Sequence, residues 1–278
     1  MRPFLATAAL AIAAAATPAM ADHHQGMDHS AHTSSQHMAM VLDDERRAGD
    51  RARDQYRNPA ETLSFFRVEP GMTVVDYMPA GGWYTRVLVP YLGEDGRYIG
   101  LVPDPDAADS EGFENYFGSL PGRFEEARGE WNLSGAPVAL YASQDLPEEL
   151  EGSVDRVLIF REMHNLMRSG AAYTELRRIR QLLDDDGLVG VVQHRAGADA
   201  PADYVDGSKG YLRQADVVAL MQAHGFELVG ESEVNANPRD TADYPDGVWT
   251  LPPSLRGDDE SKRAIGESDR MTLLFKKR

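Results

Sequence analysis

The sequence predicts an α/β fold in which a doubly wound, mostly parallel sheet of seven strands is covered by helices on both faces. Short apolar runs of strand length alternate with segments of helical spacing, and Gly or Pro turns separate them. This alternation is typical of right-handed crossovers between parallel strands that are buried on both faces. A chain of 278 residues with 42% hydrophobic side chains can build one large domain, and no second core is visible.

Seven apolar runs supply the expected strands, at residues 72–77, 97–102, 136–141, 154–160, 187–194, 226–234 and 271–276. Helical spacing predicts helices over 83–92, 171–183 and 215–224. Asn58 as an N-cap and Pro59 as the first helical residue predict a short helix that ends at Phe66. The last two strands are joined by a stretch rich in Pro, Asp and Gly without a helix, so we expect the last strand to be antiparallel.

The first 21 residues have the pattern of a signal peptide. Arg2 supplies a positive charge, residues 4–21 carry none, and the run ends in Ala19-Met20-Ala21. Because this run is mostly Ala, it gains little from burial in lipid, which disfavours the alternative of an uncleaved anchor. We therefore expect cleavage after Ala21 and an exported, periplasmic protein with no stable membrane anchor.

Residues 22–42 form a polar segment in which five histidines stand near methionines. The histidines are His23, His24, His29, His32 and His37. So few apolar residues predict a disordered leader. Since imidazole and thioether groups suit copper, nickel and zinc, loose metal capture is the functional alternative.

We assign residues 43–278 to a single domain with an N-terminal helical extension. The extension begins in the charge-dense segment 41–57, which predicts a solvated helix.

Charge and cysteine content exclude several classes of function. The formal net charge of −17 repels phosphate backbones, so nucleic acid is not an expected partner. The chain has no Cys, which excludes a disulfide scaffold, a thiolate metal site and a Cys nucleophile.

The segment after the first strand is the expected ligand site. In a doubly wound sheet, ligands bind beyond the carboxyl ends of the strands, beside the first strand. Here Asp76 ends the apolar run, and Gly81-Gly82 permit a sharp turn into the next helix. The free amides of that helix N-terminus would face the ligand.

Motifs along nearly the whole chain beyond residue 45 carry a family resemblance. They lie at 57–59, 70–75 (Pro-Gly-Met-Thr-Val-Val), 81–85 (Gly-Gly-Trp-Tyr-Thr), 155–165, 192–196, 237–240 and 269–275. The sequence resembles a family of exported predicted methyltransferases, similar to class I S-adenosylmethionine-dependent methyltransferases. The resemblance implies a Rossmann-like methyltransferase fold, S-adenosylmethionine as the cofactor and a small-molecule acceptor.

The resemblance also implies which residues face the cofactor. Its methionine and ribose parts would lie against six residues of the turn: Asp76, Ala80, Gly81, Gly82, Trp83 and Tyr84. Ala80 stands where a third glycine is common, and it fits only if φ is negative and the ligand leaves room for a methyl group.

Two further acids are candidates for the cofactor's nucleoside. Such enzymes usually end the second strand with an acid for the ribose hydroxyls, but Val102 ends it here, and Asp104 is the nearest candidate. Asp145 is the candidate on the adenine side and would equally serve as a turn cap.

Polar side chains at the ends of the fourth and fifth strands are the candidate catalytic residues. His164 is suited to take a proton near neutral pH and Asn165 to orient it. His194 and Arg195 end the next strand at the same edge, where they would complete a pocket for an anionic substrate. The alternative is a buried hydrogen-bond network that closes the sheet end.

These observations give two hypotheses of different classes. The first is S-adenosylmethionine-dependent methyl transfer to an unidentified small acceptor in the cell envelope. The second is a catalytically inactive exported protein that keeps the fold and binds a small molecule or metal. Ala80 and Val102 depart from the family's usual cofactor-binding pattern, which favours the second hypothesis.

Overall fold

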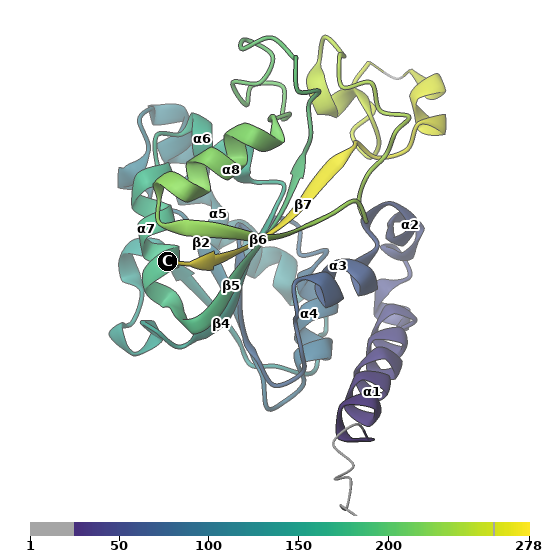
Figure 1. The fold of residues 1–278 in the computed structure, drawn as a ribbon, viewed down its shortest axis with the longest axis vertical. Coiled ribbons are helices and arrows are strands. Elements are labelled where there is room, and N and C mark those ends of the chain that lie inside the picture. The colour runs from purple at the N-terminus through teal and green to yellow at the C-terminus, as the bar shows by residue number, and fades with distance from the viewer. Residues whose placement is uncertain (1–24, 258) are drawn as a thin grey trace, which may run out of the picture.

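The computed structural model describes residues 25–257 and 259–278, with side chains from Thr33 onward. Its centre is a single seven-stranded sheet in the order β3-β2-β1-β4-β5-β7-β6 (Figure 1). The first five strands are parallel to one another, whereas β7 is antiparallel to both of its neighbours. The predicted fold class, including the antiparallel last strand, is confirmed.

The strands are β1 (Thr73–Tyr77), β2 (Arg97–Val102), β3 (Val138–Ala142), β4 (Val154–Phe160), β5 (Leu183–His194), β6 (Phe226–Ser232) and β7 (Arg270–Lys277). The α-helices are α1 (Gln25–Leu42), α2 (Asp54–Arg57), α3 (Pro59–Phe65), α4 (Thr85–Leu92), α5 (Glu111–Gly129), α6 (Met163–Arg168), α7 (Ala172–Leu182) and α8 (Gln214–Ala223).

Helices cover both faces of the sheet, and each face has its own apolar core. Helices α6, α7 and α8 lie on one face and α1, α3 and α4 on the other (Figure 1). Their apolar side chains belong to two separate core clusters. Successive residues of a strand point to opposite faces, so Val75 and Tyr77 of β1 join the first core and Val74 joins the second. Asp76 therefore lies on the α4 side of β1.

Helices α5 and α6 are two elements that sequence patterning does not predict. Helix α5 contains Gly112, Gly118, Pro121 and Gly122, residues that ordinarily interrupt helices. Its buried residues nevertheless include Phe117 and Phe124, and packing of such aromatic side chains outweighs a low helix propensity. Helix α6 is a short helix that begins at Met163, shortly after β4 ends at Phe160.

The prediction of a disordered leader over residues 22–42 is wrong from Gln25 onward, where α1 (Gln25–Leu42) forms. Met38 and Val41, three residues apart on α1, are each only 5% exposed and pack in the core on the α4 side. This spacing places both on one helix face, and the polar composition around them conceals it. Residues 1–24, which include the expected signal peptide, lie outside the described residues.

The prediction of one solvated helix over residues 41–57 is also wrong. The segment divides into two 3₁₀ helices (Glu45–Arg47 and Arg51–Arg53) and α2. Arg47 and Arg57 are 1% and 2% exposed, because their guanidinium groups find partners inside the fold, including the ring of Trp83 at 5.1 and 4.5 Å.

Asn58 does not cap α3 as predicted. Its backbone is left-handed (φ 39°), and its side chain makes no cap hydrogen bond. Instead its Nδ2 donates to the carbonyl of Val234 at 2.6 Å, which ties the start of α3 to the segment after β6.

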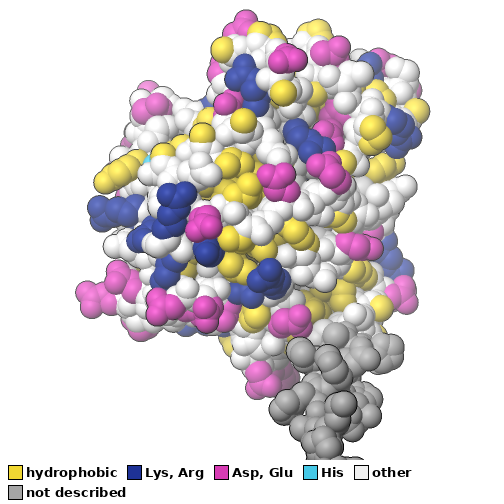
Figure 2. Space-filling view, viewed as in Figure 1, with side chains coloured by type: hydrophobic (Ala, Val, Ile, Leu, Met, Phe, Trp, Pro, Cys, Tyr) yellow, Lys and Arg dark blue, Asp and Glu magenta, His cyan; other side chains and the backbone are white. Residues whose placement is uncertain are grey.

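The surface carries the negative net charge in a dispersed form. On the face in Figure 2, acidic and basic side chains are interspersed, with hydrophobic side chains exposed between them. Among the described helices, none is both long and apolar enough to cross a membrane.

Candidate active site

The loop between β1 and α4 has an unusual backbone. Met78, Ala80 and Gly82 all adopt positive φ, at 54°, 49° and 70°. The left-handed region costs a non-glycine residue roughly 1–2 kcal/mol, and such strain tends to accumulate at binding sites. The condition that Ala80 fits only with a negative φ is wrong: its methyl group is accommodated in a strained conformation with positive φ.

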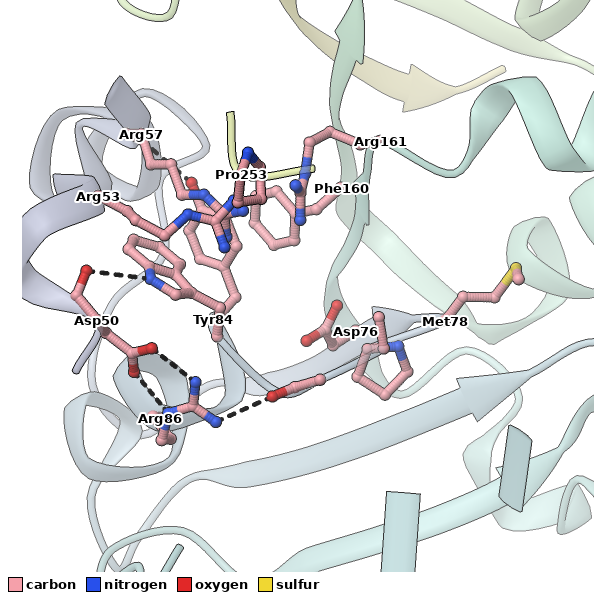
Figure 3. A pocket seen from close by; sticks show the side chains of 14 residues that line it. Asp50, Arg53, Arg57, Asp76, Met78, Tyr84, Arg86, Phe160, Arg161 and Pro253 are labelled. Atoms are coloured by element: carbon pink, nitrogen blue, oxygen red, sulfur yellow. Dashed lines mark hydrogen bonds and ion pairs between the residues drawn. The ribbon is translucent and has the colours of Figure 1, made fainter. Parts of the chain in front are cut away.

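A polar cavity of about 220 Å³ lies on one side of this loop, at the carboxyl end of β1 (Figure 3). Its walls come from the N-terminal segment, the loop after β1, the start of α4, the end of β4 and one proline. The lining residues are Asp50, Arg53, Arg57, Asp76, Met78, Pro79, Ala80, Gly81, Trp83, Tyr84, Arg86, Phe160, Arg161 and Pro253.

An apolar cavity of about 230 Å³ lies on the other side of the same loop. It shares residues 78–81 with the polar cavity, and Val102 and four residues of α5, Tyr116, Leu120, Phe124 and Ala127, supply apolar lining. Among the described residues, Arg123 is the one cation in its lining. A Cβ added at Gly81 would meet no atom within 4 Å, so the space beside Gly81 is open on the loop that the two cavities share.

Gly82 serves a different purpose from the one expected. A Cβ at this position would lie 2.1 Å from ring atoms of Trp131, so the close approach that glycine permits is to Trp131. The Trp131 ring also packs edge-on against Phe124 and lies under Arg86. Gly82 thus holds the loop against the core, and Gly81 is the glycine that borders the cavities.

Asp76 presents a buried carboxyl group to the polar cavity. Among the described residues, the carboxyl group is hydrogen-bonded by the hydroxyl of Tyr98, which donates to Oδ2 at 2.9 Å and is itself paired with Thr85. Burial raises the pKa of Asp76 to about 7, against the lowering effect of the Tyr98 hydrogen bond. A cationic group of a ligand would find a carboxylate with unused acceptor capacity here.

Four arginines that sequence analysis did not select also line the polar cavity: Arg53, Arg57, Arg86 and Arg161. Arg86 is paired with Asp50. In Figure 3, Arg53 and Arg57 extend from the N-terminal segment toward Tyr84 and Phe160, and Arg161 approaches from the end of β4. Glu267 binds Arg53 at 2.6 Å and Arg57 at 3.4 Å. Their separation from Glu267 by 214 and 210 residues leaves no local signal of this cluster in the sequence.

Glu267 is the anionic centre of this cluster. Although burial works to raise the pKa of Glu267, the neighbouring guanidinium groups of Arg270, Arg57 and Arg53 lower it to about 2. Burial, and next the charge of Arg161, lower the pKa of Arg57, yet a guanidinium group stays charged at neutral pH.

Two aromatic rings form the floor beside the arginines. Tyr84 and Phe160 stack with ring centroids 3.5 Å apart and planes 5° apart. Trp83, which also lines the cavity, packs edge-on against Tyr84. Six of the predicted cofactor residues thus meet at this loop, and all but Gly82 line the polar cavity.

The two predicted nucleoside acids lie elsewhere. The carboxylate of Asp104 binds Arg178 at 3.1 Å and caps a 3₁₀ helix, and Asp145 is exposed after β3. Neither lines the polar or the apolar cavity. Val102 occupies the end of β2 and contributes an apolar side chain to the wall instead.

His164 and His194 come together as expected, with ring centroids 6.1 Å apart. Both are buried, and burial lowers the pKa of His164 to about 4 and that of His194 well below its usual range. His194 Nδ1 is 2.6 Å from the Ser268 hydroxyl, and His164 Nδ1 is 3.5 Å from the Gln193 amide. Neither ring is among the residues that line the two cavities.

Asn165 and Arg195 are engaged with other partners. Asn165 donates to Glu162 at 2.8 Å and borders a separate open hollow with Arg168. Arg195 is paired with Asp269 and Glu233 at 2.9 and 2.6 Å, so its charge is already compensated.

The predicted metal ligands lie outside the described side chains, except for His37. The His37 ring lies 5.5 Å from the ring of Tyr91. Across the residues that the structure describes, no three His, Asp or Glu side chains are grouped closely enough to hold a metal ion.

Comparison with known proteins supports the fold. The structure is similar to a cyclopropane-fatty-acyl-phospholipid synthase-like protein from Lactobacillus casei, with a TM-score of 0.51, 13% identity and coverage of 87% of this chain and 98% of that one. An S-adenosylmethionine-dependent methyltransferase from Aquifex aeolicus has a TM-score of 0.49 and 15% identity, with coverage of 86% of this chain and 97% of that one. No family model and no curated protein sequence matches this chain. The first similarity, together with the strand order, confirms the Rossmann-like methyltransferase fold.

Proposed function

We propose that this protein transfers a methyl group from S-adenosylmethionine to a small acceptor in the cell envelope, after export and removal of residues 1–21. One observation carries the proposal: a polar cavity with a buried carboxyl group and an apolar cavity meet at the loop after β1. This is the ligand-binding edge of a doubly wound sheet.

The two cavities fit the two chemically different halves of the cofactor. Asp76 would pair with the ammonium group of the methionine part, and Gly81 leaves space beside the loop. The apolar side chains of α5 would hold the adenine ring. Val102 offers the ribose hydroxyls no hydrogen bond, so we expect weaker binding than an acid at the end of β2 would give.

When bound, S-adenosylmethionine supplies a methyl group that its sulfonium has already activated. The protein then has to orient donor and acceptor and keep water out. The rings of Tyr84 and Phe160 and the partly enclosed cavity serve both purposes. A proton-accepting role for His164 stays a prediction from the sequence: burial lowers the pKa of its ring to about 4, which makes the neutral imidazole a weak base, and the ring lies outside the cavity lining.

Calorimetry with S-adenosylmethionine and its demethylated product, S-adenosylhomocysteine, tests the proposal. The unmutated protein should bind both, and Gly81→Val should abolish binding because the side chain would enter the open space beside the loop. Gly122→Val is the matched control, since a Cβ there also meets no atom within 4 Å but lies on α5 outside both linings. Absence of binding to the unmutated protein at millimolar ligand would overturn the methyltransferase proposal.

Export is tested separately by mass spectrometry of protein recovered from the cell envelope. We expect a chain that begins at Asp22, because Ala19-Met20-Ala21 precedes it. Recovery of the full-length chain in the membrane would contradict this part of the proposal.

A further inference from the structure

Four arginines, Arg53, Arg57, Arg161 and Arg270, lie close together as a cluster around one carboxylate that is ionised at neutral pH, that of Glu267. Arg53, Arg57 and Arg270 all contact this carboxylate, and Arg161 lies within electrostatic range of it. Two further acids, Asp76 and Glu162, lie within electrostatic range of Arg161, but burial raises the pKa of each to about 7, so they compensate its charge only in part. Asp50 is already bound to Arg86 by two contacts of 2.5 and 2.7 Å. In a chain with a net charge of −17, such a concentration of cations is not an effect of composition.

Part of the hydrogen-bonding capacity of Arg53, Arg57 and Arg161 is also unused. Nη1 of Arg57 and Nη2 of Arg53 are buried and have no partner among the described residues. The guanidinium group of Arg161, whose backbone is held at a φ of 65°, makes no hydrogen bond or ion pair with any described residue. Buried donors without partners destabilise a fold, so each calls for an explanation such as a bound ion.

The cofactor alone does not supply that partner. S-adenosylmethionine has one carboxylate, an ammonium group and a sulfonium, so its net charge is positive. Its carboxylate can engage one guanidinium group in a bidentate pair, while its other charges are repelled by the rest of the cluster. Three arginines around one cavity match a second, anionic ligand better.

We propose that Arg161, together with Arg53 and Arg57, binds an oxyanion group, a carboxylate or a phosphate, of a small molecule in the polar cavity. The paired N–H donors of a guanidinium group match the oxygen atoms of a planar carboxylate or a tetrahedral phosphate. The stacked rings of Tyr84 and Phe160 offer an apolar surface to the remainder of the ligand. That this molecule is the methyl acceptor rests on the proposed function, whereas the anion site itself does not.

Calorimetry with inorganic phosphate and with malonate, with and without S-adenosylmethionine, tests the site. At least one of the two anions should bind the unmutated protein with a Kd below about 1 mM. The anion that binds more tightly shows whether the site prefers a phosphate or a carboxylate. Arg161→Gln should weaken that binding roughly tenfold to hundredfold, because one charge-assisted pair is lost.

The same substitution should raise the melting temperature of the protein without anion by roughly 2–4 °C, since a repelling, unpartnered cation is removed. A merely structural Arg161 would give the opposite shift. Arg263→Gln, which removes an exposed arginine far along the chain in an ion pair with Glu260, is the matched control and should change neither quantity.

The outcomes separate this proposal from the proposed function. No binding of either anion at about 10 mM, or binding that Arg161→Gln leaves intact, would overturn the anion site. Anions that compete with S-adenosylmethionine would overturn it too, because the cluster would then belong to the cofactor's carboxylate. If anions bind and S-adenosylmethionine does not, the anion site is supported and the methyltransferase proposal fails.

Discussion

Two groups of buried polar side chains lie at the carboxyl edge of the sheet, and they differ in how they are partnered. The imidazole group, His164 and His194, has neighbours inside the protein such as Ser268 and Gln193. In the arginine cluster, Arg53, Arg57 and Arg161 line a cavity. Arg53 and Arg57 share the carboxylate of Glu267, and each has a buried donor without a partner among the described residues.

This difference in partners indicates which of the two groups binds a ligand. Sequence analysis favours the histidines, because imidazole is the more reactive side chain near neutral pH. The contacts favour the arginines, because unsatisfied cations that line a cavity need an external partner. Variants of the two groups should therefore fail in different ways.

The largest effect is expected from Glu267→Gln. Removal of this carboxylate leaves several buried guanidinium groups uncompensated, which should lower the free energy of unfolding by about 3–5 kcal/mol. Urea denaturation measures the loss, and phosphate should recover part of it. A loss below about 1 kcal/mol would show that the arginines are well solvated after all.

A smaller effect is expected where α1 holds the arginine-bearing segment against the domain. Met38→Ala should lower the free energy of unfolding by about 2–3 kcal/mol, because the side chain is 5% exposed and packs in the core. Met40→Ala is the matched control on the same helix, since Met40 is 67% exposed. Equal, negligible effects of both substitutions in thermal or urea denaturation would mean that the helix is not docked.

His194→Ala should cost about 2 kcal/mol of stability through the lost hydrogen bond to Ser268 and the space left in the core. The affinities of the variant for anions and for S-adenosylmethionine should stay within about twofold of those of the unmutated protein. The comparison between the two groups breaks down if the variant keeps its stability but loses ligand binding in calorimetry.

Asp76→Asn should change the pH dependence of stability. The folded protein holds the proton of Asp76 up to about pH 7, whereas the unfolded chain releases it near the ordinary value of 3.8. The unmutated protein therefore loses stability as pH rises through this window, and the asparagine variant does not.

At pH 8 the variant should be more stable than the unmutated protein by about 2 kcal/mol, and near pH 4 the advantage should vanish. Melting temperatures across pH 4–8 measure this difference. A variant that is less stable at pH 8 would show that Asp76 is ionised and stabilised by its neighbours.

Much of the fold is predictable because its determinants are local. The apolar run of β1 and the helical spacing of α7 give those elements within a few residues. Helix α5 is missed since its Gly and Pro residues oppose helix formation and only tertiary packing stabilises it.

The candidate site divides in the same way. The loop around Gly81 follows from the strand–glycine–helix pattern, but the role of Gly82 depends on Trp131, some fifty residues later in the sequence. The burial of Arg53 and Arg57 depends on Glu267 near the other end of the chain, so their charge-dense surroundings predict solvent exposure.

The most direct test of a two-ligand cavity is a crystal structure of the protein with S-adenosylhomocysteine and malonate bound. We expect the amino acid part of S-adenosylhomocysteine beside Asp76 and Gly81, its adenine ring against α5, and the malonate on the guanidinium group of Arg161. Malonate on Arg195, or S-adenosylhomocysteine away from the loop after β1, would contradict the central claim.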